Sequence, residues 1–194
     1  DQFVSFYSKT NNKNNLYNIL ATIASIGPYI NVKAFKKNIF SNFKIPKGRG
    51  DISKVRLHKK KIFLIDESYN SNPLSLKSAL ENYDKIESKN SKKYLILGDM
   101  LELGKNSISQ HKEMSKIINK TKINQVYVIG KYIKETFKGL KSNKKAKILN
   151  DKFSIINLIN DNLNNNDYLM IKGSNSTGLH KITNDLKQKN INVI

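Results

Sequence analysis

Short apolar runs alternate with longer amphipathic segments along the chain from residue 51 onward. A run of four to eight Ile, Val, Leu or aromatic residues between turn residues is typical of a buried strand. The clearest runs are 62–65, 94–97, 126–129 and 168–171, and 146–149 is a shorter candidate. Apolar residues at helical spacing occupy 73–83, 108–119, 133–140, 153–163 and 179–187. Strands that alternate with helices predict an α/β fold, a mostly parallel sheet with helices on both faces.

One more short apolar run, 55–57, precedes the first of these strands. Because only His58-Lys59-Lys60 separates the two, we predict that they pair antiparallel as a hairpin. The sequence therefore predicts a sheet of about six strands, in which the first is antiparallel and the others are parallel.

Residues 1–45 carry a different pattern, with few apolar positions at regular spacing. We predict a strand at 2–7, a polar turn at 10–15, a helix at 16–26 and a short helix at 32–40. The longer helix has an apolar stripe made of Leu16, Ile19, Leu20, Ile23 and Ala24. These elements are too few to form a core alone, and the chain lacks an initiator methionine. We therefore interpret 1–45 as the end of a larger domain, 46–50 as a hinge and 51–194 as the α/β domain.

The chain carries 35 basic and 15 acidic residues, a formal net charge of +20. Such a charge is typical of nucleic-acid binding. However, only Arg49 and Arg56 are arginines, and the lysines are scattered through every segment, which favours a solvated basic surface. A basic nucleic-acid-binding module stays an alternative. The absence of cysteine, of an 18-residue apolar run and of a signal peptide fits a cytoplasmic protein.

Acidic, basic and glycine residues follow the predicted parallel strands directly. They are Asp66-Glu67, Gly98-Asp99, Gly130 and Lys172-Gly173-Ser174. Ligands of an open parallel sheet bind outside the carboxyl ends of its strands, so these residues mark a candidate ligand edge. The alternative is that they only make tight turns and helix caps. Asn72, for example, is a candidate N-cap for the helix that begins at Pro73.

The loop 98–104 is unusual because it contains the large apolar residues Met100, Leu101 and Leu103. Such a loop either packs against the domain or shapes a pocket. His111 lies on the apolar side of the helix that follows, and we interpret it as a packed, hydrogen-bonded histidine in preference to a catalyst.

The remaining candidate chemistry is limited. His58 and His180 have no partner at a metal-ligand spacing, so no metal site is predicted. Residues 172–178 precede a predicted helix, where a lysine and free N–H groups would suit a carboxylate or phosphate. No P-loop pattern occurs in the sequence. The residues alone thus predict a Rossmann-like domain with a ligand edge and an incomplete site.

Three motifs occur in order along this edge. They are Asp-Glu-Ser-Tyr-Asn-Ser-Asn-Pro at 66–73, Leu-Gly-Asp-Met-Leu-Glu-Leu-Gly at 97–104 with His111 after it, and Lys-Gly-Ser-Asn-Ser-Thr-Gly-Leu at 172–179. Together they resemble the Mur ligases, and most closely the members that add D-alanyl-D-alanine to a UDP-N-acetylmuramoyl-tripeptide. The resemblance covers the whole chain but only the C-terminal part of such an enzyme. Asn175 and Thr177 stand where the family usually has Arg and Met.

The resemblance implies a Rossmann-like C-terminal domain preceded by a remnant of the central ATPase domain. It implies that Asn15 and Asn18 lie near adenine, with Asn14 where the family usually has His. It also implies that Arg49 in the hinge reaches the nucleotide phosphates. Either Asp66 or Glu67 would contact the ribose, and the choice between them stays open.

For the other substrates, the resemblance implies binding residues in all three motifs. These are Tyr69, Asn70, Asn72, Gly98, Asp99, Met100, Lys172, Gly173 and Ser174. Lys172 and Ser174 would hold the carboxylate of the dipeptide. No catalytic residue and no metal ligand is expected in this chain, because the phosphate loop and the Mg²⁺ sites belong to the rest of the enzyme.

The family's reaction uses ATP to phosphorylate the carboxylate of the UDP-muramoyl-tripeptide, and the dipeptide amine then attacks the acyl phosphate. The C-terminal domain closes onto the central one to complete the site. The implied partners are ATP with Mg²⁺, the UDP-N-acetylmuramoyl-tripeptide, D-alanyl-D-alanine and the other domains of a monomeric, cytoplasmic enzyme of peptidoglycan synthesis. A sister ligase that adds another amino acid is the main alternative.

Overall fold

The computed structural model describes residues 3–10, 13–57, 59–151 and 153–188. Internal contacts divide the chain into two compact units, Asp1–Ile45 and Pro46–Ile194. His58, for which we predict a place in a hairpin turn and no metal ligation, lies outside the described residues, as does Gln2 of the predicted first strand.

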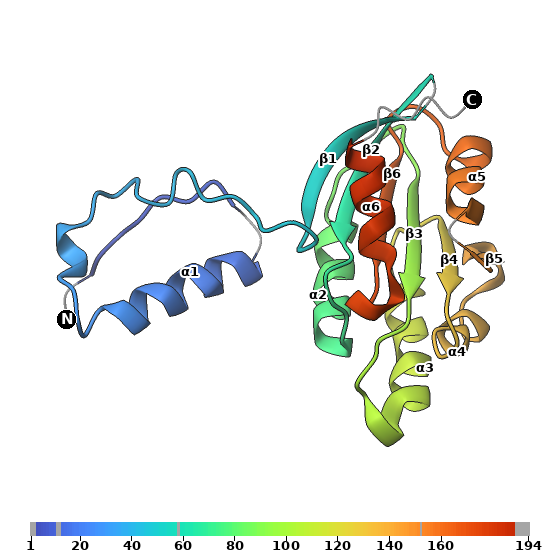
Figure 1. Cartoon of the computed structure of the whole chain (residues 1–194), viewed down its shortest axis with the longest axis horizontal. Coiled ribbons are helices and arrows are strands. Elements are labelled where there is room, and N and C mark those ends of the chain that lie inside the picture. The colour runs from blue at the N-terminus through green and yellow to red at the C-terminus, as the bar shows by residue number, and fades with distance from the viewer. Residues whose placement is uncertain (1–2, 11–12, 58, 152, 189–194) are drawn as a thin grey trace. The chain divides into compact units, whose positions relative to one another are not determined.

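The larger unit is built on a six-stranded sheet (Figure 1). Its strands are β1 (Asp51–Leu57), β2 (Lys60–Glu67), β3 (Lys93–Gly98), β4 (Gln125–Ile129), β5 (Lys145–Ile148) and β6 (Tyr168–Lys172). Their order in the sheet is β1-β2-β6-β3-β4-β5. The pair β1–β2 is antiparallel and all other neighbours are parallel, so the predicted mixed sheet is confirmed.

Five helices cover the two faces of this sheet (Figure 1). They are α2 (Pro73–Asp84), α3 (Ser107–Ile118), α4 (Lys134–Lys138), α5 (Phe153–Asn162) and α6 (Leu179–Gln188). Side chains of α2, α3 and α4 share one hydrophobic cluster, and those of α5 and α6 share the other. The helix predicted at 133–140 is shorter than expected, since α4 begins after its N-cap Ile133 and ends before its C-cap Gly139. Ile133 and Leu140 are buried just outside it.

Burial on both faces explains why the apolar runs of the central strands are continuous. All six residues of β3 are buried. Because side chains alternate along a strand, Tyr94 and Ile96 enter the cluster under α5 and α6, while Leu95 and Leu97 enter the cluster under α2, α3 and α4. A strand covered on both faces needs apolar residues at every position, as parallel strands usually do.

Helix α2 begins where the sequence predicts. The side chain of Asn72 accepts a hydrogen bond from the backbone N–H of Ser75, and the Ser75 hydroxyl oxygen accepts one from the N–H of Asn72. Pro73 occupies the first helical turn, where its missing N–H is not needed. This capping box confirms that Asn72 is an N-cap and fixes the end of the loop that follows β2.

The smaller unit corrects several predictions. Its helix α1 (Lys13–Ile26) starts inside the predicted polar turn, and residues 3–7 form no strand. A backbone hydrogen bond from Tyr7 to Lys37 and one isolated bridge replace the strand. The predicted helix at 32–40 is only a three-residue 3₁₀ turn, Val32–Ala34.

The apolar stripe of α1 is largely uncovered. Ile19 is buried, but Leu16 and Leu20 are exposed. The prediction of a helix is correct, and the exposure of its stripe agrees with the expectation that these elements are too few to form a core alone. Among the described residues, no helix is long and apolar enough to cross a membrane.

We predict that the core of the larger unit depends on α2 at Leu80, which has no exposed surface. Leu80→Ala should lower the free energy of unfolding by about 2–5 kcal/mol, since it leaves a cavity between α2 and the sheet. The matched control is Leu74→Ala on the same helix, where the leucine is 79% exposed and the change should stay within about 0.5 kcal/mol. Urea unfolding of both variants measures the difference, and equal losses would contradict this account of the core.

Candidate ligand site at the carboxyl edge of the sheet

Three loops meet at the carboxyl edge because β6 lies between β2 and β3. Lys172, the last residue of β6, is level with Glu67 of β2 and Leu97 of β3. The chain leaves β2 and β3 toward α2 and α3 on one face, and leaves β6 toward α6 on the other. Connections that diverge in this way open a crevice, which is the usual ligand position in an open α/β sheet.

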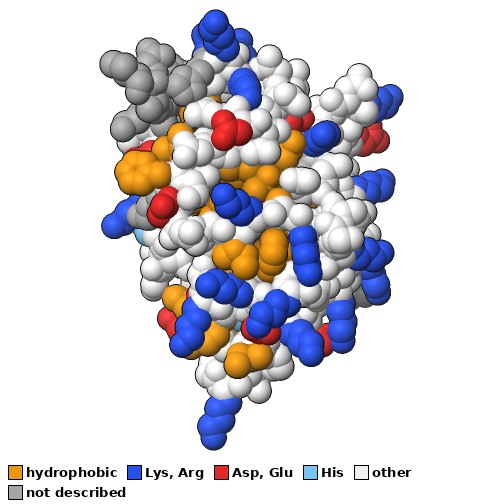
Figure 2. All heavy atoms as spheres, turned by 90° about the vertical axis from the view of Figure 1, so that its right-hand side faces the viewer, with side chains coloured by type: hydrophobic (Ala, Val, Ile, Leu, Met, Phe, Trp, Pro, Cys, Tyr) orange, Lys and Arg blue, Asp and Glu red, His pale blue; other side chains and the backbone are white. Residues whose placement is uncertain are grey.

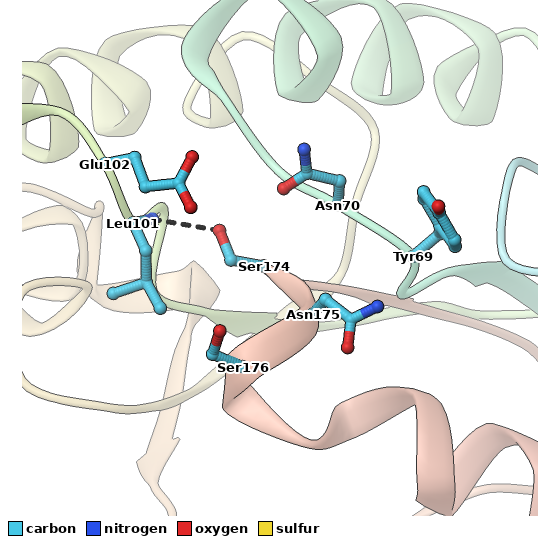
Figure 3. Close-up of a pocket in the computed structure, with 7 residues that line it drawn as sticks. All are labelled: Tyr69, Asn70, Leu101, Glu102, Ser174, Asn175 and Ser176. Atoms are coloured by element: carbon cyan, nitrogen blue, oxygen red, sulfur yellow. Dashed lines mark hydrogen bonds between the residues drawn. The ribbon is translucent and has the colours of Figure 1, made fainter.

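A pocket of ≈ 210 Å³ occupies this crevice (Figure 3). It is lined by Tyr69, Asn70, Leu101, Glu102, Ser174, Asn175 and Ser176. Each of the three loops therefore contributes to the lining. Tyr69, Asn70 and Ser174 are residues that the sequence predicts for substrate binding, and the structure brings them to one pocket.

Ser174 joins the three loops. Its hydroxyl accepts a hydrogen bond from the N–H of Leu101 at 2.9 Å and donates one to the carbonyl of Ser71 at 3.2 Å. Its own N–H donates to the carbonyl of Asp99 at 3.0 Å. The hydroxyl is therefore already used in holding the pocket together (Figure 3).

Gly98 and Gly173 are needed for close packing at the strand ends. A Cβ atom at Gly98 would lie 2.8 Å from the Cδ1 atom of Leu179, and one at Gly173 would lie 2.9 Å from the same atom. The start of α6 therefore rests directly on the backbone of these two glycines. Their position gives them a packing role, which suffices to account for the absence of a side chain.

Lys172 and Glu67 form a buried pair below the pocket. The Lys172 side chain is only 1% exposed, and its ammonium lies 3.3 Å from Glu67 Oε2 and donates to the carbonyl of Asn70 at 2.9 Å. Burial lowers the pKa of Lys172 and raises the pKa of Glu67, and the attraction between the two charges opposes both shifts. Lys172 thus fixes the loop after β2, and it is not among the residues that line the pocket.

Asp66 is engaged inside the domain. Its Oδ1 accepts from the N–H and hydroxyl of Ser68 at 3.0 and 2.5 Å, and its Oδ2 lies 2.5 Å from Lys187 on α6. Lys187 also pairs with Asp51 of β1 at 2.6 Å. Burial by itself raises the pKa of Asp66, but the bonds from Lys187 and Ser68 outweigh it and bring the pKa below its ordinary value. Of the two acids in the motif, Glu67 is the less buried.

Asp99 connects β3 to the loop after β4. Its carboxylate accepts from the N–H groups of Lys131 and Ile133 at 2.9 and 2.7 Å. Gly130 lies against it with φ +139°, and a Cβ atom there would be 2.6 Å from the carboxylate. Asp99 therefore holds a neighbouring loop and does not face the pocket.

Met100 and His111 are both fully buried. The N–H of Met100 donates to His111 Nε2 at 3.0 Å, so His111 Nδ1 must carry the proton that it shares with the Ser107 carbonyl at 2.7 Å. This neutral histidine anchors the loop after β3. The interpretation of His111 as a packed, hydrogen-bonded residue is confirmed.

The predicted hinge contacts the loop after β2. The N–H of Tyr69 donates to the carbonyl of Gly48 at 3.1 Å, and Gly48 has φ +76°, which favours glycine. The Arg49 guanidinium lies 4.3 Å from the centre of the Tyr69 ring. A cation over an aromatic face is held by the ring quadrupole, so Arg49 is positioned beside the pocket residue Tyr69.

The two asparagines predicted to lie near adenine are in the smaller unit. On α1, Asn15 is buried and Asn18 is exposed. In the part of the chain that the structure describes, no group of three or more His, Cys, Asp or Glu side chains could hold a metal ion.

Four of the lining residues, Leu101, Glu102, Asn175 and Ser176, were not predicted to bind substrate, although Leu101 was named in a loop that could shape a pocket. Glu102 has a structural signal that the sequence does not carry. Its φ is +64°, and only Asn166 shares a positive φ among the other non-glycine residues described. A bulky residue in this conformation is uncommon and clusters at ligand sites.

Charge on the surface is dispersed where Figure 2 displays it. Lys and Arg side chains on this face lie among apolar and uncharged residues and are most numerous in its lower half. The distribution agrees with a solvated basic surface on that face.

Residues 54–175 match the model of the Mur ligase family described as the glutamate ligase domain. The chain is 31% identical over 169 residues to the UDP-N-acetylmuramoyl-tripeptide–D-alanyl-D-alanine ligase of Rickettsia prowazekii, covering 87% of this chain and 36% of the relative. It is 29% identical over 187 residues to the enzyme of the same name from Bacillus subtilis, covering 94% and 40%. The chain thus spans well under half the length of these relatives.

Solved structures have the same fold. The MurF ligase of Thermotoga maritima in complex with ADP superposes with a TM-score of 0.71 at 20% identity, over 94% of this chain and 39% of that one. MurF of Acinetobacter baumannii gives a TM-score of 0.69 at 19% identity, over 95% and 39%. At this identity the likeness establishes the fold, and it confirms the predicted fold class.

We predict that Lys187→Met destabilises the protein by about 3–5 kcal/mol near neutral pH, because it leaves the buried Asp66 carboxylate without its cation. Because the pKa of Asp66 is lowered, its pairing with Lys187 stabilises the folded protein above pH 3.8, the ordinary aspartate pKa. This stabilisation is lost as the pH falls through the pKa that Asp66 has in the folded protein. Because the pKa of Lys187 is raised, the stabilisation by this pairing persists below pH 10.5. It is lost as the pH rises through the pKa that Lys187 has in the folded protein.

Unfolding experiments on wild type and Lys187→Met at a series of pH values measure the difference in their free energies of unfolding. This difference should shrink at the acidic and at the alkaline end of the series. The control is Lys116→Met, which removes an exposed lysine paired with Glu113 and should cost less than about 1 kcal/mol. A difference that does not shrink as the pH falls below 3.8 or rises above 10.5 would contradict the ion-pair explanation.

Proposed function

The chain belongs to the Mur ligase family, and from this premise we propose that it is the C-terminal part of an ATP-dependent amide ligase. We propose that the whole enzyme joins D-alanyl-D-alanine to UDP-N-acetylmuramoyl-tripeptide in peptidoglycan precursor synthesis. The observation that carries this proposal is the meeting of three family motifs at one pocket. The names of the sequence relatives support the choice of substrates.

In this reaction, ATP transfers its terminal phosphoryl group to the tripeptide carboxylate and leaves ADP. The dipeptide amine then forms a bond to the acyl carbon and gives up a proton. The C–O bond to phosphate breaks, and phosphate departs with the electron pair. The chain's own contribution is to bind and align, because closing two domains around the reactants replaces a collision with a positioned encounter.

In our proposal, Arg49 and Tyr69 form the part of the site that binds the nucleotide. A guanidinium that is fixed against an aromatic ring loses less freedom when it binds a phosphate, and its planar fork suits phosphate oxygens. Glu67, less buried than Asp66, is the better placed of the two acids to accept from a ribose hydroxyl. Mg²⁺ is assigned no ligand here, since the described residues form no group that could hold a metal.

The smaller unit would complete the central domain of the enzyme. Nine of its large apolar side chains are exposed, namely Phe3, Val4, Tyr7, Leu16, Tyr17, Leu20, Tyr29, Ile30 and Ile39. A segment that packs against further sequence of the same domain would show such exposure. With 46–50 as the hinge, Asn15 and Asn18 would then serve the adenine from this side. We expect a monomeric, cytoplasmic enzyme.

A sister ligase that adds another amino acid is the second candidate, because the matching family model is described as a glutamate ligase domain. Its reaction uses the same acyl-phosphate chemistry with a different amine and with the UDP-sugar acceptor that this amine extends. The two candidates therefore separate by the amine on which ADP release depends.

We predict that the full-length protein carrying this chain releases ADP from ATP only when UDP-N-acetylmuramoyl-tripeptide and D-alanyl-D-alanine are both present. The dipeptide is required because it consumes the acyl phosphate. A coupled assay of ADP release measures this, with L-alanine, D-glutamate and diaminopimelate as competing amines. ADP release that depends on one of these in place of the dipeptide would favour the second candidate.

We predict that Arg49→Ala raises the KM for ATP about tenfold or more in that assay, since a phosphate contact with a charged donor contributes about 1.5–3 kcal/mol. Tyr69→Leu should give a smaller increase of the same kind, and Tyr69→Phe, which keeps the ring, should restore the wild-type value. The control is Arg56→Ala, the other arginine, which is exposed on β1. An unchanged KM and turnover in Arg49→Ala would refute the role of Arg49.

A further inference from the structure

Two glycines, one on either side of Arg49, fix the predicted hinge to the larger unit. The N–H of Gly48 donates to Asp51 Oδ1 at 2.7 Å. The N–H of Gly50 donates to the carbonyl of Asp66 at 2.7 Å. Both glycines have a positive φ, +76° and +93°, which a residue with a side chain rarely adopts. The backbone on both sides of Arg49 is therefore ordered, although glycines at such a place in a sequence are typical of a flexible loop.

Arg49 closes a four-residue turn that begins at Pro46. Its N–H donates to the carbonyl of Pro46 at 3.2 Å, and the positive φ of Gly48 at the third position is the one that a type II turn requires. Gly48 is buried against Tyr69, since a Cβ atom on this glycine would lie 3.0 Å from the Cβ atom of the tyrosine. Arg49 itself is exposed. The turn thus leaves Arg49 accessible on a fixed backbone.

Lys187 of α6 holds Asp51 in the position that this turn needs. Asp51 and Asp66 lie directly opposite each other on β1 and β2, where two like charges repel. The Lys187 ammonium pairs with both, 2.6 Å from Asp51 Oδ2 and 2.5 Å from Asp66 Oδ2. No more than 20% of any of the three side chains is exposed, so water screens these charges weakly. Asp51 therefore uses one carboxylate oxygen for the cation and the other for the N–H of Gly48.

We propose that Asp51 and Lys187 are positioning residues for Arg49. They act by fixing the turn from which the guanidinium reaches the nucleotide phosphates, and they touch no substrate themselves. The inference rests on the proposed function for the role of Arg49, and it extends the nucleotide site to a lysine near the end of α6. An arginine whose backbone is ordered before binding loses less conformational freedom on binding, so the arrangement tightens the binding of ATP.

A cluster that only stabilised the fold would behave differently in an assay. Its loss would lower the fraction of folded enzyme and therefore the apparent turnover. The KM for ATP is a property of the folded molecules alone, so a lower stability by itself leaves it unchanged. The KM for ATP thus separates a positioning role from a purely structural one.

The first test is the KM for ATP of the full-length protein that carries this chain. We expect Asp51→Ala to raise it about fivefold, because the N–H of Gly48 loses its acceptor. Lys187→Met should raise it by a similar factor. Neither change should add to the effect of Arg49→Ala in a double variant, because both act through that arginine.

Two controls accompany this test, and both should leave the KM for ATP unchanged. Leu80→Ala lowers the stability of the same domain at a core position away from the turn. Glu81→Ala removes an exposed acid and so matches the change in net charge of Asp51→Ala.

The second test needs no substrate. Amide hydrogen exchange of the ¹⁵N-labelled 194-residue chain, followed by NMR, reports how firmly the N–H of Gly48 is bound. We expect it to exchange about tenfold faster or more in Asp51→Ala than in the wild type. The internal reference is the N–H of Met100, which is bonded to His111 in another loop and should not accelerate. A global loss of stability would accelerate both signals.

An unchanged KM for ATP in Asp51→Ala, an effect that adds fully to that of Arg49→Ala, or equal acceleration at Gly48 and Met100 would each overturn the proposal. A similar rise of the KM in Leu80→Ala would also overturn it, because lost stability would then suffice. Failure of the proposed function has a different readout, since ADP release would then not depend on D-alanyl-D-alanine. In that case the exchange comparison still holds, and the KM for ATP is compared with the amine that the enzyme uses.

Discussion

The insertion of β6 between β2 and β3 is the constraint on which the rest of the structure depends. It brings residues that are about 105 positions apart, Glu67 and Lys172, to the same level of the sheet. It also sends the chain to opposite faces on leaving neighbouring strands, which opens the crevice. The loops that carry the three motifs therefore meet for a topological reason. Strand pairing alone brings them together, and side-chain contacts such as those of Ser174 then fix their detailed geometry.

Burying this edge brings charges into the domain, and each buried charge must have a partner. Lys172 meets this requirement with Glu67, and Lys187 meets it with Asp51 and Asp66. The Lys187 pairing also ties the last helix to the first two strands. Several charges that look functional in the sequence thus belong to the scaffold. In this fold, an acid or a lysine at a strand end serves first to neutralise another buried charge.

Periodicity was enough to predict the sheet, because strands covered on both faces leave continuous apolar runs that turns interrupt. In residues 1–45 it predicted helix α1 but was wrong about a strand over residues 3–7 and about a helix at 32–40, where the structure has only the 3₁₀ turn Val32–Ala34. The edge itself was predictable from glycines and acids at strand ends. The role of Asp66 was not, because Lys187 lies about 121 positions away and no spacing rule connects them. Glu102 was missed because its signal is a backbone angle, which no residue type at that position announces.

The motif residues consequently divide into two groups. Gly98 and Gly173 allow close packing at the edge, and the Asp99 side chain holds a neighbouring loop. Tyr69 and Glu102 instead line the pocket. Substitution in the first group would disturb the scaffold whatever the ligand is. Only the second group can change the choice of ligand at little structural cost. A family that keeps one scaffold and varies its amine substrate should therefore differ chiefly at the residues that line the pocket. The motif residues thus indicate the fold more strongly than they indicate the choice of substrate.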